Sequence, residues 1–401
     1  MKREKTANIL FAAAFLGFLV LMAAVFFVLP RNDVSFFENR RLAERPELTK
    51  ESVLSGAYFS GMEDWLKDRA AGRSTLLRLD TRYRLLRNCT LLRCPVVNET
   101  VVLENVLLPF NPYETVNPDA LTAGAQALAA NLDSVRAATE ACGGQYLFVM
   151  VPCQYVSYES EYPSFLNNRA EVTVISRTAL LDALAQTDVE VLDMGETLLQ
   201  PEVRDRAASR VDNHYTLYGA YRTYVEIMDR INAGRGTPLT VLDGTNSTVT
   251  ELPSRYLGSR SRKLLNQSGI TEHLEILTPN EAVPFRRWNG GTESAPTVYR
   301  LPASEWELAD YGLYMGGDMP ETVIDTDRED LPTVLVYGDS FTNAVECLLW
   351  YGFGEMRSLD LRYYTDMSLG AYIETYRPDY VICIRDYEQL ASTDYNGRPA
   401  F

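Results

Sequence analysis

Histidine and paired cysteines are scarce in this chain. Its 401 residues include two histidines, and none of its six cysteines falls in a Cys-x-x-Cys spacing. This shortage argues against a zinc site built from cysteine and histidine, and we expect no metal. Glycine-rich phosphate loops are also missing, so no nucleotide cofactor is expected. Basic residues number 38 against 54 acidic ones, and the net charge of −16 argues against nucleic acid as a partner.

One long apolar run lies near the N-terminus. Ile9 to Leu29 contains no charged residue and follows Lys2, Arg3 and Lys5. At about 1.5 Å per residue it can cross the roughly 30 Å core of a bilayer. The basic residues ahead of it predict a cytoplasmic N-terminus, with a single-pass anchor and an extracytoplasmic remainder. A cleaved signal peptide is the alternative, although it usually has a shorter apolar segment and a small-x-small cleavage site, which is missing after Leu29.

The sequence divides into regions with different predicted secondary structure. We interpret residues 1–30 as a cytoplasmic tip with the anchor, and residues 31–100 as a charged, helical stalk or N-terminal region. Residues 101–401 alternate between helix and strand patterns, with an irregular insertion at about 243–330. The clearest segments are a helix at Asp119 to Ala141 and strands at Tyr146 to Val151, Thr333 to Tyr337 and Tyr380 to Ile384. Such alternation predicts an α/β fold with a mainly parallel sheet covered by helices on both faces.

A serine follows one of these predicted strands. In Gly338-Asp339-Ser340-Phe341, the glycine allows a tight turn and Ser340 precedes a predicted helix. Open parallel sheets place their sites at the carboxyl ends of strands, where the Ser340 hydroxyl is exposed and its N–H faces any oxyanion formed on it. The alternative is a helix-capping serine without a catalytic role.

A serine nucleophile needs a base, and the chain has only two candidates. His273 lies in the irregular region and is interpreted as a surface residue. His214 precedes a predicted helix, and Asp212 lies two residues upstream, where it can orient the imidazole. Asp212 and Asn213 are otherwise simple turn residues. We therefore predict a triad of Ser340, His214 and Asp212.

These motifs resemble the SGNH hydrolases, and the order of the triad, with the Asp-x-His pair ahead of the serine, resembles the DHHW family and the related alginate O-acetyltransferases. The segments that carry the resemblance are Glu38 to Ala43, Ser55-Gly56, Asp68-Arg69, Gly72-Arg73, Asp212 to Thr216, Gly219 to Tyr221, Tyr256 to Ser259, Gly316 to Asp318, Gly338 to Phe341, Asp360 to Tyr363 and Pro378 to Val381. Two departures concern the site. Asn213 replaces the first histidine of Asp-His-His-Trp, and Gln154 stands where many relatives have a lysine.

The resemblance implies an SGNH-like, flavodoxin-like domain that transfers acetyl groups through an acetyl-serine. It implies a cell-surface polysaccharide as substrate and a membrane-bound O-acyltransferase as partner and acetyl donor. Beside the Ser340 N–H, the candidates for binding the oxyanion or substrate are Asn343, Gln154, Gly316 and Gly317. Two alternatives stay open: an esterase that removes acetyl groups, and a non-catalytic polysaccharide-binding or scaffold component of an envelope assembly.

Overall fold

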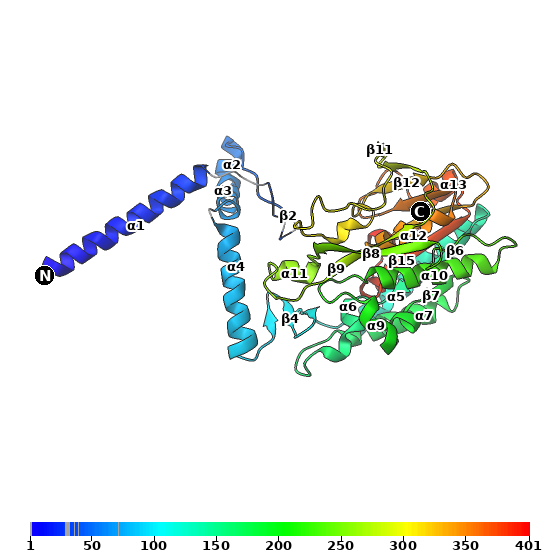
Figure 1. The fold of residues 1–401 in the computed structure, drawn as a ribbon, viewed down its shortest axis with the longest axis horizontal. Helices are drawn as coiled ribbons and strands as arrows, with labels where there is room; N and C mark the ends of the chain where they lie inside the picture. Colours follow the sequence, from blue (N-terminus) through cyan, green and yellow to red (C-terminus); the bar gives the residue numbers. More distant parts are fainter. Residues whose placement is uncertain (1, 29–32, 36, 39, 71) are drawn as a thin grey trace. The chain divides into compact units, whose positions relative to one another are not determined.

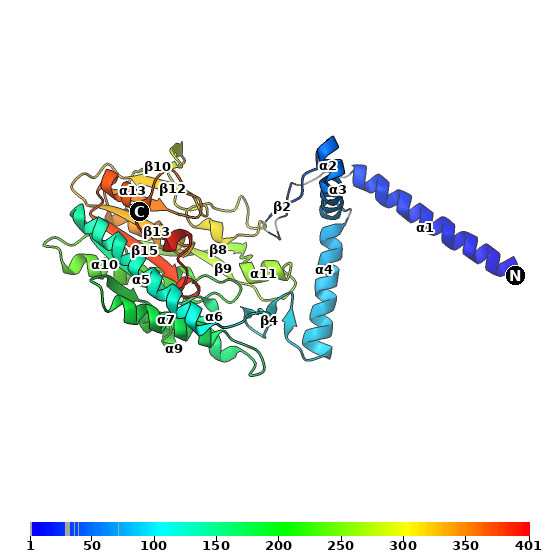
Figure 2. The ribbon, with the colours of Figure 1, turned by 180° about the vertical axis from the view of Figure 1, so that it is seen from behind.

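The computed structural model describes residues 2–28, 33–35, 37–38, 40–70 and 72–401. The chain forms two compact units, which we describe separately. The first comprises Met1–Asn98 with Ser261–Gly269, and the second comprises Glu99–Arg260 with Ile270–Phe401. Figure 1 and Figure 2 show their elements from opposite sides.

The first unit is mainly helical. Its elements are α1 (Lys2–Val28), β1 (Val34–Ser35), β2 (Arg40–Arg41), α2 (Lys50–Leu54), α3 (Ala57–Asp68), α4 (Arg73–Arg84), a π-helical turn at Leu85–Leu91 and β3 (Val96–Val97). Two ion pairs connect the β1–β2 hairpin to α3 and α4. Arg73 lies 2.5 Å from Glu38, and Arg40 lies 2.6 Å from Asp68. The hairpin is thereby held against the helices by charge rather than by a large apolar core.

Helix α1 covers most of the run from Ile9 to Leu29, and Leu29 itself lies outside the described residues. Within the part of the chain that the structure describes, no helix has the length and apolarity needed to cross a membrane. The transmembrane anchor expected from the sequence is therefore not supported by the structure.

The second unit is built on an eight-stranded sheet with the order β11-β10-β12-β14-β13-β15-β6-β7. The strands are β6 (Gln145–Val151), β7 (Glu190–Asp193), β10 (Arg286–Asn289), β11 (Thr292–Ser294), β12 (Glu321–Asp325), β13 (Thr333–Gly338), β14 (Glu355–Leu359) and β15 (Tyr380–Asp386). Strands β14, β13, β15, β6 and β7 are parallel, whereas β12, β10 and β11 continue the sheet in antiparallel fashion. The expected α/β fold is confirmed, and its sheet is mixed.

The helices of this unit lie over both faces of the sheet (Figures 1 and 2). They are α5 (Pro118–Ala141), α6 (Gln154–Ser157), α7 (Ala170–Leu184), α8 (Gly195–Leu198), α9 (Pro201–Ala207), α10 (Leu217–Ala233), α12 (Thr342–Leu349) and α13 (Leu369–Tyr376), and α11 (Ser259–Lys263) spans the boundary between the units. Helix α5 packs against α7 and α13, and α10 packs against α9 and α12. All seven residues of β15 are buried because helices cover both of its faces.

A smaller ribbon completes the second unit. Strands β8 (Ser247–Arg255) and β9 (His273–Pro279) pair in antiparallel fashion outside the main sheet. A short hairpin of β4 (Thr100–Val102) and β5 (Leu107–Pro109) precedes α5. Residues 243–330, for which the sequence indicates irregular structure, thus contain a ribbon and three strands of the main sheet.

Candidate active site

Ser340 lies just beyond the carboxyl end of β13, between the two parallel neighbours β14 and β15. The turn requires glycine at position 338, because an added Cβ would lie 2.0 Å from the Ile384 carbonyl oxygen. The carboxylate of Asp339 then fixes the turn. Its Oδ1 accepts the N–H of Phe341 at 3.0 Å, and its Oδ2 accepts the N–H of Asp386 at 2.9 Å. Ser340 remains partly exposed at the edge of the sheet.

His214 reaches this turn from the loop between α9 and α10. Its Nε2 lies 2.7 Å from the Ser340 Oγ, and its Nδ1 lies 2.5 Å from the Asp212 Oδ1. The two turns are also connected directly, because the Tyr215 hydroxyl donates a hydrogen bond to the Phe341 carbonyl oxygen. The structure therefore brings together the three residues predicted as a triad, in the order that a nucleophile, a base and an orienting carboxylate require.

Asp212 is held in one orientation by backbone donors. Its Oδ1 accepts the N–H of His214 at 3.0 Å, and its Oδ2 accepts the N–H of Ser259 at 2.5 Å. Gly258 permits the second contact, since a Cβ there would lie 2.4 Å from the Val211 carbonyl oxygen and 2.8 Å from the Asp212 Cβ.

The same surroundings set the charge of Asp212. Burial alone raises the pKa of this carboxyl, but the charge and hydrogen bond of His214 and the N–H groups of Ser259 and His214 outweigh burial. The pKa of Asp212 consequently lies well below its usual range, and the group is an anion at neutral pH.

Aromatic rings enclose the imidazole. The Tyr311 ring stacks on His214 with a centroid separation of 3.6 Å and an interplanar angle of 4°, and the Phe341 ring lies 4.8 Å away at 50°. The Tyr311 hydroxyl is buried without a hydrogen-bond partner among the described residues, so its ring is its main contact with the site. Sequence reasoning missed Tyr311, because it lies in a loop whose pattern gives no sign of the stacking.

Two of the predicted oxyanion or substrate residues have their side chains occupied by other contacts. Gln154 donates to the Ser209 carbonyl oxygen at 3.0 Å and accepts from Arg260 at 3.2 Å. Asn343 donates to the Asp318 Oδ1 at 2.9 Å. Through its bond to Ser209, Gln154 thus stabilises the loop that leads to His214. Through its bond to Asp318, Asn343 stabilises the loop that contains Gly316 and Gly317.

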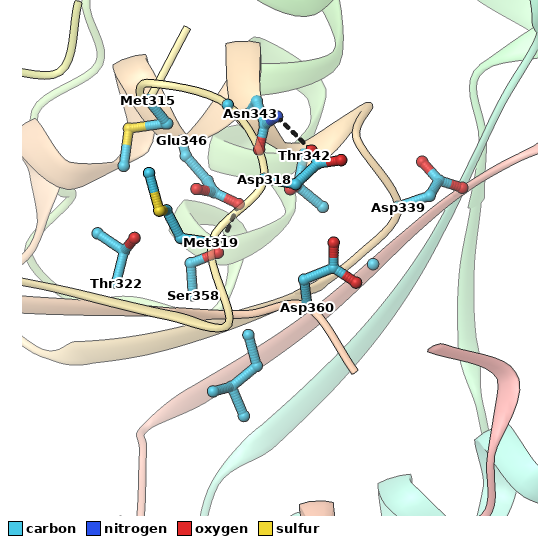
Figure 3. Close-up of a pocket in the computed structure, with 13 residues that line it drawn as sticks. Met315, Asp318, Met319, Thr322, Asp339, Thr342, Asn343, Glu346, Ser358 and Asp360 are labelled. Atoms are coloured by element: carbon cyan, nitrogen blue, oxygen red, sulfur yellow. Dashed lines mark hydrogen bonds between the residues drawn. The ribbon is translucent and has the colours of Figure 1, made fainter. Parts of the chain in front are cut away.

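Gly316 and Gly317 lie in that loop, with φ angles of +80° and +94° that favour glycine. The Gly317 N–H donates to the Tyr314 carbonyl oxygen at 3.0 Å, whereas the N–H groups of Gly316 and Ser340 meet no acceptor among the described residues. Gly317 also lines a small cavity of about 10 Å³, which Figure 3 shows with Asp318, Asp339 and Glu346 around it. These acidic groups make this small cavity unsuitable for an oxyanion.

Fold and geometry together define the class. An α/β sheet with a serine after a central parallel strand, faced by an Asp-x-His loop, is an SGNH-like fold. Residues 110–294 match the family model described as "SGNH hydrolase-like domain, acetyltransferase AlgX". The chain therefore contains an SGNH-like domain related to acetyltransferases, and the resemblance recognised in the sequence is confirmed. The matched segment includes Asp212 and His214 and ends before Ser340.

Solved structures support the same fold. Bacillus cereus PatB1, solved with a sulfonyl adduct, has 20% identity and a TM-score of 0.59, with 73% of this chain and 95% of that chain covered. A DHHW family protein from Eubacterium siraeum has 16% identity and a TM-score of 0.55, with 75% of this chain and 95% of that chain covered. No curated protein sequence matches the chain.

Proposed function

We propose that this protein is a serine acyl-transfer enzyme, most specifically an O-acetyltransferase that acts on a polysaccharide. The observation that carries the proposal is the continuous contact from Asp212 through His214 to the Ser340 hydroxyl. A serine hydroxyl is a weak nucleophile until a base takes its proton, and His214 lies within the distance that proton transfer needs.

The reaction proceeds in two balanced steps. In the first, the Ser340 Oγ attacks the acetyl carbonyl carbon while His214 Nε2 takes the hydroxyl proton, and the protonated imidazole then gives that proton to the leaving oxygen. The bond between the carbonyl carbon and the leaving oxygen breaks, which leaves acetyl-Ser340. In the second, an acceptor hydroxyl loses its proton to His214 and attacks the acetyl group, and Ser340 recovers the proton as its ester bond breaks. Asp212 stabilises the imidazolium in both steps.

Backbone donors best suit the oxyanion that forms in each step. The Ser340 N–H and the Gly316 N–H have no acceptor among the described residues, so they are available to a developing negative charge. We assign the Ser340 N–H, which belongs to the nucleophile itself, as the donor to this oxyanion.

The acceptor and the location of the enzyme are further parts of the proposal. The relation to an acetyltransferase family supports acetyl transfer. We propose a polysaccharide hydroxyl as the acceptor and a membrane-bound O-acyltransferase as the donor, as the family resemblance of the sequence implies. The apolar run at Ile9 to Leu29, preceded by basic residues, supports a position outside the cytoplasm.

A chromogenic acetyl ester tests the chemistry. The wild-type chain is expected to release the chromophore, and Ser340→Ala and His214→Ala are expected to lower kcat by about 10³-fold or more. The matched control is His273→Ala, because the other histidine is exposed on β9 and should leave the rate unchanged. Mass spectrometry of a quenched reaction should detect acetyl-Ser340. A wild-type rate equal to that of Ser340→Ala, with no acyl adduct, would overturn the proposal in favour of a binding or scaffold protein.

The same reaction separates transferase from esterase. With an oligosaccharide present, a transferase yields an O-acetylated sugar at the expense of free acetate. If the products are free acetate and unmodified sugar, water is the acceptor and the protein is a carbohydrate esterase.

A further inference from the structure

A second cavity lies in the same unit as Ser340, beside the two helices that flank the Asp-x-His loop. It has a volume of about 350 Å³ and is lined by the first turns of α10, the strands β8 and β9, and the end of α9. This volume is within the range of small-molecule sites, and the cavity is not part of the machinery described above. Three connections place it near that machinery: α10 begins three residues after His214, the Tyr314 hydroxyl donates to the Glu275 carbonyl oxygen, and the Tyr314 ring packs on Tyr311.

Two tyrosines form one wall of the cavity. Tyr218 and Tyr221 are separated by one turn of α10 and therefore share a face of the helix. Neither hydroxyl has a hydrogen-bond partner within the described residues, and the Arg206 guanidinium lies 4.0 Å from the Tyr218 ring centroid. Tyrosine rings of this kind offer a flat apolar surface with a polar edge, which suits the alternation of C–H and hydroxyl groups on a sugar ring.

Two carboxylates face this wall. Asp243 and Glu275 both line the cavity, and no hydrogen bond or ion pair reaches the Glu275 carboxylate from any described residue. Burial raises the pKa of Glu275, and the charge of Glu251, which lies opposite in the β8–β9 register, raises it further. A half-buried carboxylate that accepts no hydrogen bond from the protein is stabilised by a ligand whose hydroxyl groups donate hydrogen bonds to it.

The charge balance limits what that ligand can be. Two carboxylates line the cavity against one guanidinium, that of Arg206, and Glu251 adds a third negative charge nearby. A sugar that carries its own carboxylate would meet like charge in a partly buried space, which is unfavourable. A neutral sugar meets acceptors for its hydroxyl groups and no repulsion.

We propose that this cavity binds a neutral sugar residue of a hydroxyl-rich glycan and disfavours uronate residues. The inference rests on the proposed function for its biological meaning, because a glycan held here would be the acceptor of the acyl group on Ser340. Tyr221 supplies the stacking surface, and Glu275 and Asp243 accept the sugar hydroxyl groups.

Isothermal titration calorimetry on the full chain tests this without any turnover. The probes are cellohexaose and N-acetylated chitohexaose, which are neutral, and hexagalacturonate. We expect a neutral hexasaccharide to bind, Tyr221→Ala to weaken that binding about fivefold or more, and hexagalacturonate to bind at least about tenfold more weakly at low salt. Glu275→Gln should reduce the difference in binding affinity between the neutral probes and hexagalacturonate. The control is Tyr113→Ala, which removes a tyrosine that is 87% exposed and outside the cavity.

Three results would overturn the inference: no binding of either neutral probe, equal binding to wild type and Tyr221→Ala, or equal affinity for hexagalacturonate. Trp306 is an exposed aromatic residue outside the cavity lining. Loss of binding in Trp306→Ala but not in Tyr221→Ala would place the sugar at that surface and would also overturn the inference. Ser340→Ala should bind like wild type. Binding without Ser340-dependent ester cleavage would therefore count against the proposed function alone, and ester cleavage without binding would count against this inference alone.

Discussion

The Tyr311 ring lies parallel to the His214 imidazole, with 3.6 Å between the ring centroids. The Tyr311 ring thus packs against one face of the imidazole. Hydrogen bonds to Asp212 and Ser340 hold its two nitrogens, but they leave rotation about the line between them unopposed. Tyr311 opposes that rotation, so we regard it as a positioning residue.

Tyr311→Leu is expected to lower kcat for an acetyl ester roughly 10- to 100-fold with little change in KM, because small misplacements of a catalytic group are costly. Tyr311→Phe keeps the ring and removes a buried hydroxyl that lacks a partner, so it should keep the wild-type rate and its stability within about 1 kcal/mol. Tyr224→Leu, which removes a buried ring of α10 that does not contact His214, is the control for general destabilisation. Equal loss of kcat in Tyr224→Leu and Tyr311→Leu would contradict a positioning role.

Gly258 provides a second test of how the site is supported. A Cβ at this position would lie 2.4 Å from the Val211 carbonyl oxygen, so Gly258→Ala must move the Ser259 N–H away from Asp212. We expect kcat to fall roughly tenfold or more in Gly258→Ala, measured with the same acetyl ester. Gly236→Ala is the matched control, because an added Cβ there meets no atom within 4 Å. An unchanged rate in Gly258→Ala would show that the Ser259 contact is dispensable.

The parts of the fold that the sequence predicts well are those with strong local signals. Helix α5 (Pro118–Ala141) begins one residue before the predicted start. Both of its ends carry a local signal: the Asn117 side chain accepts the Ala120 N–H, and Gly143, with φ +88°, follows the last turn. Strands β6 and β15 are continuous apolar runs, as buried parallel strands usually are.

The sequence does not predict strands β10, β11 and β12, because each is only three to five residues long and none is buried along its whole length. Strand β12 pairs with β14, β10 pairs with β12, and β11 pairs with β10, and a single sequence carries no record of these pairings.

The candidate site likewise combines residues that local signals predict with contacts that only the tertiary fold creates. His214 was selected because the chain has only two histidines, and Asp212 because it lies two residues away. Gln154 and Asn343 are candidates that accompany the family resemblance, and their amide groups bond to Ser209 and Asp318. The contacts of Tyr311 with His214 and of Ser259 with Asp212 are not predicted, because they join segments far apart in the sequence. Residue types in the sequence predict which groups could react, whereas the contacts that position those groups depend on the tertiary fold.

The hairpin of the first unit should be sensitive to acid. The hydrogen bond from Arg73 lowers the pKa of Glu38 from 4.5 to about 2. Because the pKa of Glu38 is lower in the folded state, the ion pair stabilises the folded protein at pH values above the unfolded-state pKa. This contribution to the free energy of unfolding is lost as the pH falls from about 4.5 towards about 2. Hydrogen exchange in peptides from residues 33–70, corrected for the intrinsic rate, should lose protection over that range in wild type. Glu38→Gln should already lack that protection at pH 6, and Glu44→Gln, at an exposed position, should behave like wild type. Equal protection of wild type at pH 6 and pH 3 would contradict the role of the ion pair.

Asp386 makes the stability of the serine turn fall with rising pH instead. Burial and the nearby charge of Asp339 raise the pKa of Asp386 well above its ordinary value, so folding favours the protonated form of this carboxyl. A raised pKa in the folded state gives stability that is present at low pH and lost as the pH rises through the folded value. The free energy of unfolding should therefore fall as the pH rises from the unfolded pKa towards the raised folded pKa, by up to about 1.4 kcal/mol per pH unit for this proton.

Asp386→Asn imitates the neutral acid and retains an acceptor for the Glu388 N–H, which donates to the Asp386 Oδ1 at 2.6 Å. Urea denaturation between pH 5 and pH 9 should accordingly give a flatter stability profile for Asp386→Asn than for wild type. Asp366→Asn, at an exposed position, should follow the wild-type profile. If the two carboxyls instead ionise together without penalty, Asp386→Asn and wild type will show the same pH dependence. In that case Asp339 holds the Ser340 turn through its backbone contacts alone, with no contribution from a shared proton.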